Sequence, residues 1–204
     1  MLNMLNGIFL NVIQHYLYKK STMKLLPLLF GFSLLAHISN AQQTAEPADK
    51  VLAAAYKQAV KENKQVIVMF HASWCGWCHK MDASMNDESC KKFFSDNYVI
   101  VHLTVEESAK NKNLENPGAD VIKAKYHGEK AGLPFWLILD NKGTLIGDSY
   151  IRPKGTSLDV PGDNIGCPAD ENEVTAFIEL LKRSSSLKDD QLAVIAARFK
   201  KNKS

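Results

Sequence analysis

Outside its first 41 residues, the sequence has no excess of charge of either sign. Those residues hold Lys19, Lys20 and Lys24 and no acidic residue, so that of 25 basic and 22 acidic residues, 22 of each remain after Ala41. A nucleic-acid-binding protein needs basic side chains gathered into a patch or stripe. Because the body of the chain has no such cluster, the sequence excludes DNA and RNA as partners.

The sequence also lacks internal repeats, low-complexity tracts and an uninterrupted apolar run long enough to span a membrane. Its apolar content of 46% fits neither a disordered chain nor a collagen-like fibre. A length of 204 residues suits one globular domain with a sizeable core and some appended segments.

Residues 1–41 have the pattern of a targeting segment rather than of a folded domain. A basic stretch precedes the mostly apolar run Leu25–Ala36, and small residues follow at Ser39–Ala41, where a signal peptidase would cut before Gln42. The pattern predicts export, with a periplasmic location, and Met23 is an alternative start for such a signal. An uncleaved membrane anchor is the other interpretation, and only in that form would the chain contact a membrane.

Beyond residue 41, hydrophobic patterning predicts one α/β domain: a polar leader over 42–49, the domain over 50–183 and an additional C-terminal helix within 184–204. A long loop at 152–169, rich in proline and glycine, interrupts the domain. The predicted strands are 66–70, 98–103 and 135–139, and the last of them forms a hairpin with 144–151. The predicted helices are centred on 52–60, 119–126, 174–181 and 192–199. The first strand is a continuous apolar run, typical of a strand buried on both faces. We therefore expect a mixed sheet with helices around it.

Cysteines are few, at four, and two of them lie in one short motif, Cys75-Gly76-Trp77-Cys78. The motif follows the first strand and begins a helical pattern, which places Cys75 where unpaired N–H groups and the helix dipole favour a thiolate. Cys78 follows one turn later, close enough to form a small ring with Cys75. Motifs of this kind lower the cysteine pKa to about 3.5–7.5, and the thiolate is the attacking species. The spacing predicts Cys75 as the nucleophile and Cys78 as the thiol that resolves a mixed disulfide.

Three further elements occur in order after the cysteine motif: Asn116–Gly118, Lys125–Tyr126 and Gly132–Phe135. Together with the motif they resemble the thioredoxin superfamily, and more narrowly its exported bacterial thioredoxin-like members. The similarity runs from Val51 to Phe177, most of the chain after the targeting segment. Several spaced elements in one order are far more specific than an isolated C-x-x-C.

The resemblance implies a thioredoxin-like α/β fold, with a central mixed sheet flanked by helices, and thiol–disulfide oxidoreductase activity on protein thiols or disulfides. It implies a cis peptide bond before Pro134, beside the cysteine pair, and a backbone at Leu133 that pairs with an extended substrate segment. Trp74, Gly76 and Trp77 would shape the site. No cofactor and no metal are implied, and the partners are protein substrates and a redox donor or acceptor of unspecified identity.

Departures from the family pattern leave parts of the mechanism open. Thioredoxins have a buried aspartate six residues before the first cysteine, but this chain has Met69, so proton transfer from the resolving thiol falls to His71, to His79 or to water. The dipeptide Gly76-Trp77 replaces Gly-Pro, so the direction of electron flow cannot be inherited. The loop 152–169 is longer than the family requires, and we expect it near the cysteine pair, where it would shape substrate access.

Two other functions use the same cysteines. With His79 the motif satisfies C-x-x-C-H, the attachment site of covalent haem, for which Met81 or Met85 would be an axial ligand. The preceding strand and the downstream Gly-Leu-Pro signature argue against a small haem domain. A non-catalytic binding module would instead use the cysteines as a structural disulfide, although so short a loop gains little stability from one.

The remaining cysteines stand alone, so a zinc site lacks the second close pair of ligands, and His71 and His79 are expected to be surface or packing residues. Cys90 shares a helical spacing with Phe93 and Phe94 and is predicted to lie in the core. Cys167 has no periodicity around it; it is either a bridge partner of Cys90 or a third redox thiol. The Trp74 ring either joins Trp77 in an apolar rim for extended substrate or packs over the sheet edge.

Overall fold

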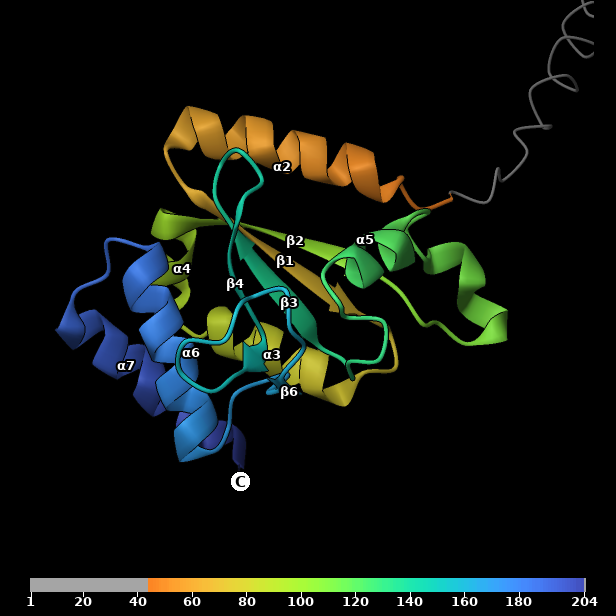
Figure 1. Cartoon of the computed structure of the whole chain (residues 1–204). Helices are drawn as coiled ribbons and strands as arrows, with labels where there is room; N and C mark the ends of the chain where they lie inside the picture. The colour runs from red at the N-terminus through yellow and green to blue at the C-terminus, as the bar shows by residue number, and fades with distance from the viewer. Residues whose placement is uncertain (1–43, 204) are drawn as a thin grey trace, which may run out of the picture. The chain divides into compact units, whose positions relative to one another are not determined.

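The computed structural model describes residues 44–203 and builds them around a four-stranded sheet in the order β2-β1-β3-β4. β1 (Gln65–His71) is parallel to β2 (Tyr98–Thr104) and antiparallel to β3 (Phe135–Leu139), which pairs antiparallel with β4 (Leu145–Asp148). The mixed sheet flanked by helices that the sequence predicts is confirmed (Figure 1).

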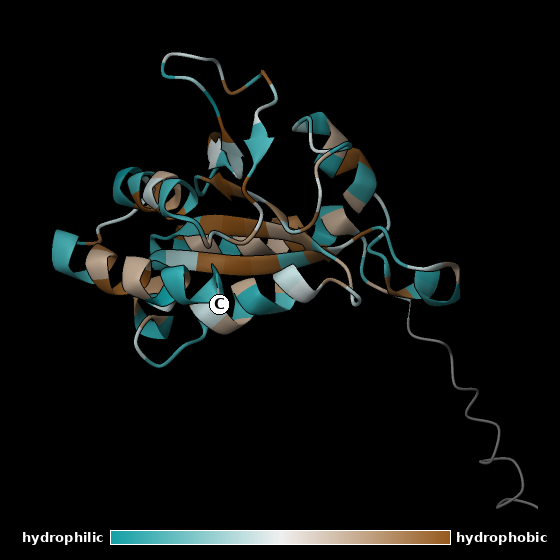
Figure 2. Cartoon of the chain, turned by 90° about the horizontal axis from the view of Figure 1, so that it is seen from below, coloured by the Kyte–Doolittle hydropathy of each residue, from teal (hydrophilic) through white to brown (hydrophobic). Residues whose placement is uncertain are grey.

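The central strand has apolar side chains on both faces, which is why both faces are covered. Val66, Val68 and Phe70 join one core, and the alternating Ile67 and Met69 join the other. The first core includes residues of α2 (Ala48–Glu62) and α5 (Ala119–Lys125), and the second includes residues of α3 (Gly76–Met85), α4 (Lys91–Asn97), α6 (Glu171–Ser184) and α7 (Asp189–Lys200). Figure 2 shows the hydrophobic strands in the middle, with hydrophilic helix surfaces outside them.

The C-terminal helix α7 belongs to the second core and is not an independent appendage. Phe199 of α7 is fully buried, with its ring centroid 4.9 Å from that of Phe177 in α6 and 6.2 Å from that of Phe94 in α4. Aromatic pairs at such distances stabilise a core beyond their buried area. Among residues 44–203, no helix combines the length and the apolar character that crossing a membrane requires.

The predicted second strand of the hairpin is divided in two. β4 ends at Asp148, and β5 (Tyr150–Ile151) pairs instead with β6 (Asp163–Asn164), inside the loop that the sequence predicts to be irregular. The division falls at Ser149, whose N–H donates to the Trp136 carbonyl while its own carbonyl accepts from Ile165. The strand thus changes its pairing partner from β3 to β6 at a single residue. No local sequence pattern predicts this change.

Smaller differences lie at segment ends. The 3₁₀ helix η1 (Ala109–Leu114) forms in a polar stretch for which the sequence predicts no element, and a second, η2 (Lys201–Lys203), extends α7. Helix α2 begins at Ala48, two residues before the predicted domain boundary. The predicted signal at 1–41 and the first two residues of the 42–49 leader lie outside the described residues.

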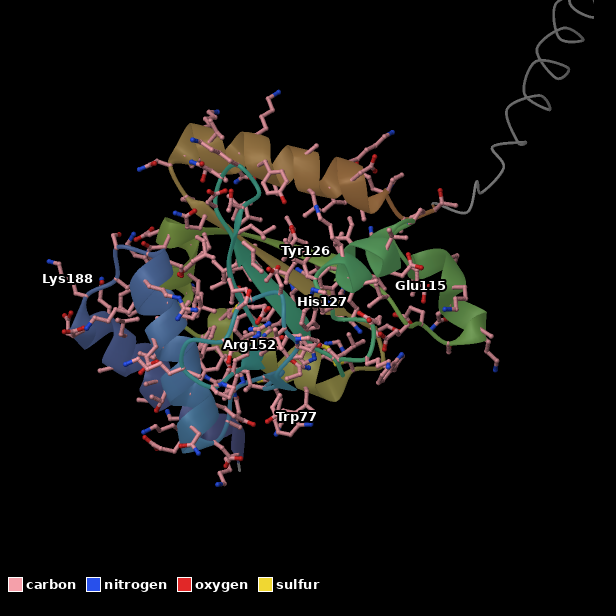
Figure 3. All side chains as sticks on the ribbon, viewed as in Figure 1. Trp77, Glu115, Tyr126, His127, Arg152 and Lys188 are labelled. Carbon is pink, nitrogen blue, oxygen red and sulfur yellow. A yellow bond between two sulfur atoms is a disulfide. The ribbon has the colours of Figure 1, made fainter. Side chains whose placement is uncertain are left out.

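A buried ion pair fixes the first half of the loop 152–169. Both terminal nitrogens of the Arg152 guanidinium lie 2.7 Å from the Asp148 carboxylate, and the two side chains are 7% and 1% exposed. Arg152 also donates to the carbonyls of Val160 and Leu158, so that one side chain closes the loop. Figure 3 labels Arg152 in front of the sheet.

We expect Arg152→Met to lower the free energy of unfolding by about 3–5 kcal/mol, because it leaves the Asp148 carboxylate buried without its partner. Lys182→Met is the matched control, since it breaks an exposed pair with Asp189 whose side chains are 61% and 81% exposed. Such a pair contributes no more than about 1 kcal/mol. Urea denaturation of both variants measures the difference; equal losses would contradict the prediction.

Candidate active site

The two motif cysteines lie at the junction of β1 and α3. A tight turn over Ala72–Cys75 joins these elements, with the Cys75 N–H donating to the Ala72 carbonyl at 3.0 Å. Cys75 is the N-cap of α3, and its Sγ accepts the N–H of Cys78 at 3.1 Å. The two sulfurs form a disulfide of 2.00 Å, with Cα atoms 5.3 Å apart. The strand–helix placement predicted from the sequence is confirmed.

The turn before β3 lies beside this pair. Phe70 is paired with Phe135 across the antiparallel strands, so the ends that follow β1 and precede β3 leave the sheet at one edge. The Leu133–Pro134 peptide bond is cis, as the family resemblance implies. The side chain of Leu133 packs against a small buried cluster of Ala72, Cys75 and Cys78.

Two tryptophans form an exposed rim around the nearly buried disulfide. Cys75 is 3% and Cys78 0% exposed, whereas Trp74 and Trp77 are 60% and 48% exposed. The Trp74 indole N–H donates to the Glu106 carbonyl at 2.9 Å, and Figure 3 shows Trp77 projecting outward at the lower edge of the molecule. Neighbouring residues therefore cover less than half of the Trp74 side chain, and both tryptophans leave apolar ring surface exposed.

A buried carboxylate holds the residues before the first cysteine. Glu107, 4% exposed, accepts the Ser73 N–H at 2.5 Å and the Ser73 hydroxyl at 2.8 Å. Burial raises the pKa of Glu107, but the two hydrogen bonds from Ser73 outweigh it and bring the pKa below its usual value. Glu107 thus stays ionised and fixes the Ser73–Trp74 backbone.

A buried lysine connects the neighbouring loops. The Lys123 ammonium lies 2.5 Å from the Glu106 carboxylate and 2.9 Å from the Ala131 carbonyl, with 3% of its side chain exposed. Glu106 has a φ of 55°, in the left-handed region, and its carbonyl accepts from Trp74. One cation therefore joins the loop that supports Trp74 to the loop that leads to Leu133.

The position of the family's buried aspartate is apolar. Met69 is fully buried in the second core, next to Trp136 in the β1–β3 register. The two histidines proposed as substitutes bind other groups: His71 lies 3.1 Å from the Thr104 hydroxyl, and His79 lies 3.0 Å from the Ser73 carbonyl. Burial and the neighbouring His102 lower the pKa of His71, so its ring is neutral at pH 7.

The second half of the loop 152–169 reaches the site, as expected. Asn164 donates from its amide to the Gly132 carbonyl at 2.8 Å, and the Trp136 indole donates to the Gly166 carbonyl at 2.7 Å. A pocket of about 400 Å³ opens here, and its lining includes Trp77, Leu133 and Cys167.

Cys90 and Cys167 are both free and buried, so the bridge between them that the sequence left open does not form. The core position predicted for Cys90 is confirmed. Burial raises the pKa of Cys167 to about 12, and its sulfur accepts from the Asn202 amide at 3.3 Å. Cys167 therefore borders the site as a thiol and not as a thiolate.

Metal and haem ligands are not gathered at the site. Within the described part of the chain, no three His, Cys, Asp or Glu side chains are arranged to hold a metal ion. Met81 and Met85, the proposed axial ligands, are 1% and 2% exposed within the second core.

Sequence reasoning missed three supporting residues: Glu106, Glu107 and Lys123. One available signal is positional, because the carboxyl ends of parallel strands share one edge of a sheet. Glu106 and Glu107 follow β2 within three residues, at the edge where β1 leads into the cysteine motif. Lys123 gives no such signal, since its partners are set by the tertiary fold.

After reduction of the disulfide, we expect iodoacetamide at pH 8 to modify Cys75 first and to leave Cys167 unmodified. A pKa of about 12 leaves about one Cys167 thiol in ten thousand ionised at that pH, and only the thiolate reacts. Peptide mass spectrometry measures the order of modification, with denatured protein, in which all four cysteines react, as the control. Equally fast labelling of Cys75 and Cys167 in the folded protein would contradict the assignment.

Comparison with known proteins agrees with this geometry. Residues 48–141, which extend from α2 through β3, match the model of a thioredoxin-like family. No curated protein matches the chain.

Solved structures with partial likeness include a disulphide isomerase from Xylella fastidiosa (16% identity, 83% of this chain and 97% of that chain covered, TM-score 0.43). A DsbH oxidoreductase is 19% identical, with 75% of this chain and 94% of that chain covered and a TM-score of 0.39. The oxidised C-terminal domain of DsbD from Neisseria meningitidis is 19% identical, with 69% of this chain and 98% of that chain covered and a TM-score of 0.37. At these identities and TM-scores, the likenesses carry no conclusion about activity. The match of residues 48–141 to a thioredoxin-like family, together with the cis-proline and the C-x-x-C disulfide at a strand–helix junction, shows a thioredoxin-like fold that carries the redox disulfide of a thiol–disulfide oxidoreductase.

Proposed function

We propose that the protein exchanges disulfides with polypeptide substrates outside the cytoplasm, with Cys75 as the attacking thiol and Cys78 as the resolving thiol. The observation that carries the proposal is the Cys75–Cys78 disulfide at the N-terminus of α3, packed against Leu133 and the cis bond to Pro134. Both cysteines belong to one helix turn, and only this pair is disulfide-bonded among the described cysteines.

The roles of the cysteines follow from their positions. Cys75 caps the helix, where the dipole and the free N–H groups favour its thiolate, and the Cys78 N–H already lies 3.1 Å from its sulfur. Cys75 also retains 3% exposure, whereas Cys78 is fully buried. An incoming sulfur therefore meets Cys75 first.

In the reducing direction, the Cys75 thiolate attacks one sulfur of a substrate disulfide, forming a mixed disulfide and releasing the other substrate sulfur as a thiolate. Cys78 loses its proton and attacks the Cys75 sulfur, which forms the intramolecular disulfide and releases the second substrate thiolate. Two electrons pass from the cysteine pair to the substrate. In the oxidising direction the same steps run backwards, and a substrate dithiol leaves as a disulfide.

The substrate-facing surface consists of backbone and aromatic rings. We infer that an extended substrate segment pairs with the backbone at Leu133 beside Pro134, while Trp74 and Trp77 cover its apolar side chains. Gly76, the first residue of α3, has no atom within 4 Å of an added Cβ, so the approach to the pair is open there. Such a surface suits unfolded or extended polypeptide more than a small polar molecule.

Export is inferred from the sequence, with residues 1–41 as a signal cut after Ala41. A disulfide that cycles between substrates and a redox partner suits a compartment where disulfides persist. Mass spectrometry of the protein purified from its native compartment tests this inference, since a mature chain beginning at Gln42 is expected. A chain that retains residues 1–41 would show an uncleaved anchor instead.

The reduction potential of the cysteine pair decides the direction of electron flow. Thiol trapping of the mature protein in glutathione buffers measures it. A value near −270 mV would make the protein a reductant that needs an electron supply, and one near −120 mV would make it an oxidant. The absence of any reversible two-thiol transition would refute the proposed function.

We expect Cys75→Ser to abolish turnover and Cys78→Ser to accumulate a stable mixed disulfide between Cys75 and the substrate. Removing the nucleophile prevents the first step, whereas removing the resolving thiol stops the reaction after it. Non-reducing gel electrophoresis with a disulfide-bonded polypeptide measures the trapped adduct. Both variants should keep the fold, because a disulfide closing so short a loop adds little stability. Unfolding of Cys75→Ser would instead indicate a structural disulfide in a binding module.

A further inference from the structure

The last described residues lie against the helix that carries the cysteines. Asn202 of η2 is 5% exposed, and its carbonyl oxygen accepts a hydrogen bond from the Lys80 ammonium at 3.1 Å. Its side-chain oxygen accepts from the Ser84 hydroxyl at 3.0 Å. Lys80 and Ser84 both belong to α3, so Asn202 fixes the C-terminal segment to the redox helix.

Asn202 also holds the second half of the long loop. Its amide nitrogen donates to the Cys167 sulfur at 3.3 Å and to the Pro168 carbonyl at 3.2 Å, while Arg198 donates to its side-chain oxygen at 3.2 Å. Both N–H donors of the amide are therefore used, and its oxygen accepts from Arg198 and shares the single Ser84 hydroxyl hydrogen with the Lys80 carbonyl, which lies 2.8 Å from that hydroxyl.

Asn202 reaches the rim of the disulfide through its backbone carbonyl, which its side-chain bonds to Ser84 and Pro168 hold beside Lys80. The Lys80 ammonium lies 4.6 Å from the centroid of the Trp77 ring, within the range of a cation–π interaction. Trp77 stands between the two cysteines in the sequence and is half exposed. The position of its ring thus depends on a lysine whose ammonium is bound to the carbonyl of Asn202.

The same residues enclose the pocket beside Leu133. Its lining includes Trp77 and Leu133, which adjoin the disulfide, together with Cys167, whose sulfur contacts Asn202, and Lys203, which follows Asn202 in the chain. Lys203 also forms an ion pair with Asp170, the N-cap residue of α6. The pocket therefore begins at the backbone proposed to face the substrate and ends at the C-terminal segment.

We propose that Asn202 is a positioning residue for substrate binding: it sets the Trp77 ring and the part of the pocket wall formed by Cys167. The pocket takes a side chain of the substrate polypeptide next to the substrate's reacting cysteine. The proposal rests on the proposed function. It assigns to the C-terminal extension a role in binding polypeptide, separate from the chemistry at Cys75 and Cys78.

Two substrates separate binding from chemistry. A disulfide-bonded peptide fills the pocket, whereas oxidised glutathione reaches the cysteines without long flanking residues. We expect Asn202→Ala to raise the KM for the peptide about three- to tenfold, the range expected for one lost net hydrogen bond. We expect the kcat for the peptide and the rate with oxidised glutathione to change less than twofold. The reduction potential of the cysteine pair should change by less than the measurement error.

Asn97→Ala is the matched control. The Asn97 side chain accepts from the Ser186 N–H at 3.1 Å and from its hydroxyl at 2.9 Å, so it also ties the C-terminal region to the domain, but away from the pocket. It should lower stability without changing the peptide KM.

Lys80→Met, at an exposed position, should raise the peptide KM by itself. Adding Asn202→Ala to Lys80→Met should then raise the peptide KM by less than Asn202→Ala does in the wild type.

An unchanged peptide KM in Asn202→Ala, or an equal rise in Asn97→Ala, would overturn the positioning role. An equal loss of rate with both substrates would also overturn it, because the effect would then lie at the cysteines. Wild-type protein inactive on both substrates would refute the proposed function itself. If Asn202→Ala does not fold, Lys80→Met decides alone, and an unchanged peptide KM in that variant overturns the proposal.

Discussion

The antiparallel register between β1 and β3 is the constraint on which the site depends. Because Phe70 faces Phe135, the turn that follows β1 and the turn that precedes β3 meet at one sheet edge, with Cys75 on the first and Leu133 on the second. The parallel β1–β2 pairing brings Glu106 and Glu107 to the same edge. A slip of one residue would turn every side chain to the opposite face and separate these groups. Because the side chains on the two faces of β1 pack into different cores, such a slip would disrupt the packing of both.

Around this edge, each buried charge has a partner with a positioning role. Glu107 binds Ser73, and Lys123 binds Glu106 together with the Ala131 carbonyl. Unpaired, such groups would cost several kcal/mol, so their pairing keeps the loops in one arrangement. The polar network therefore fixes the side of the site formed by the loops after β2 and before β3, while α3 is fixed from the opposite side by the C-terminal segment.

The sequence predicts those features that depend on local pattern. Continuous apolar runs indicate the strands 66–70, 98–103 and 135–139, and the cysteine spacing indicates the strand–helix junction. The cis bond before Pro134 is accessible only through family resemblance. Contacts between distant residues are beyond local patterns: Asn202 and Ser84 lie 118 positions apart, and the change of strand partner at Ser149 depends on Ile165. Cys167 is buried for the same reason, since a residue from the chain end covers its sulfur.

Met69 makes the electrostatics of this site differ from those of a thioredoxin with a buried aspartate. A carboxylate at that fully buried position would need to be neutral or paired, and methionine removes the cost. The charges that remain lie in the supporting loops, where Glu107 and Lys123 are buried, and at the rim, where Lys80 lies over Trp77. Under the proposed function, we expect the helix N-terminus to be the main group that favours the Cys75 thiolate and the rim to govern which substrates approach it. In such a site the chemistry is set by α3, whereas substrate choice is open to elements added outside the sheet, including the C-terminal segment that contains Asn202.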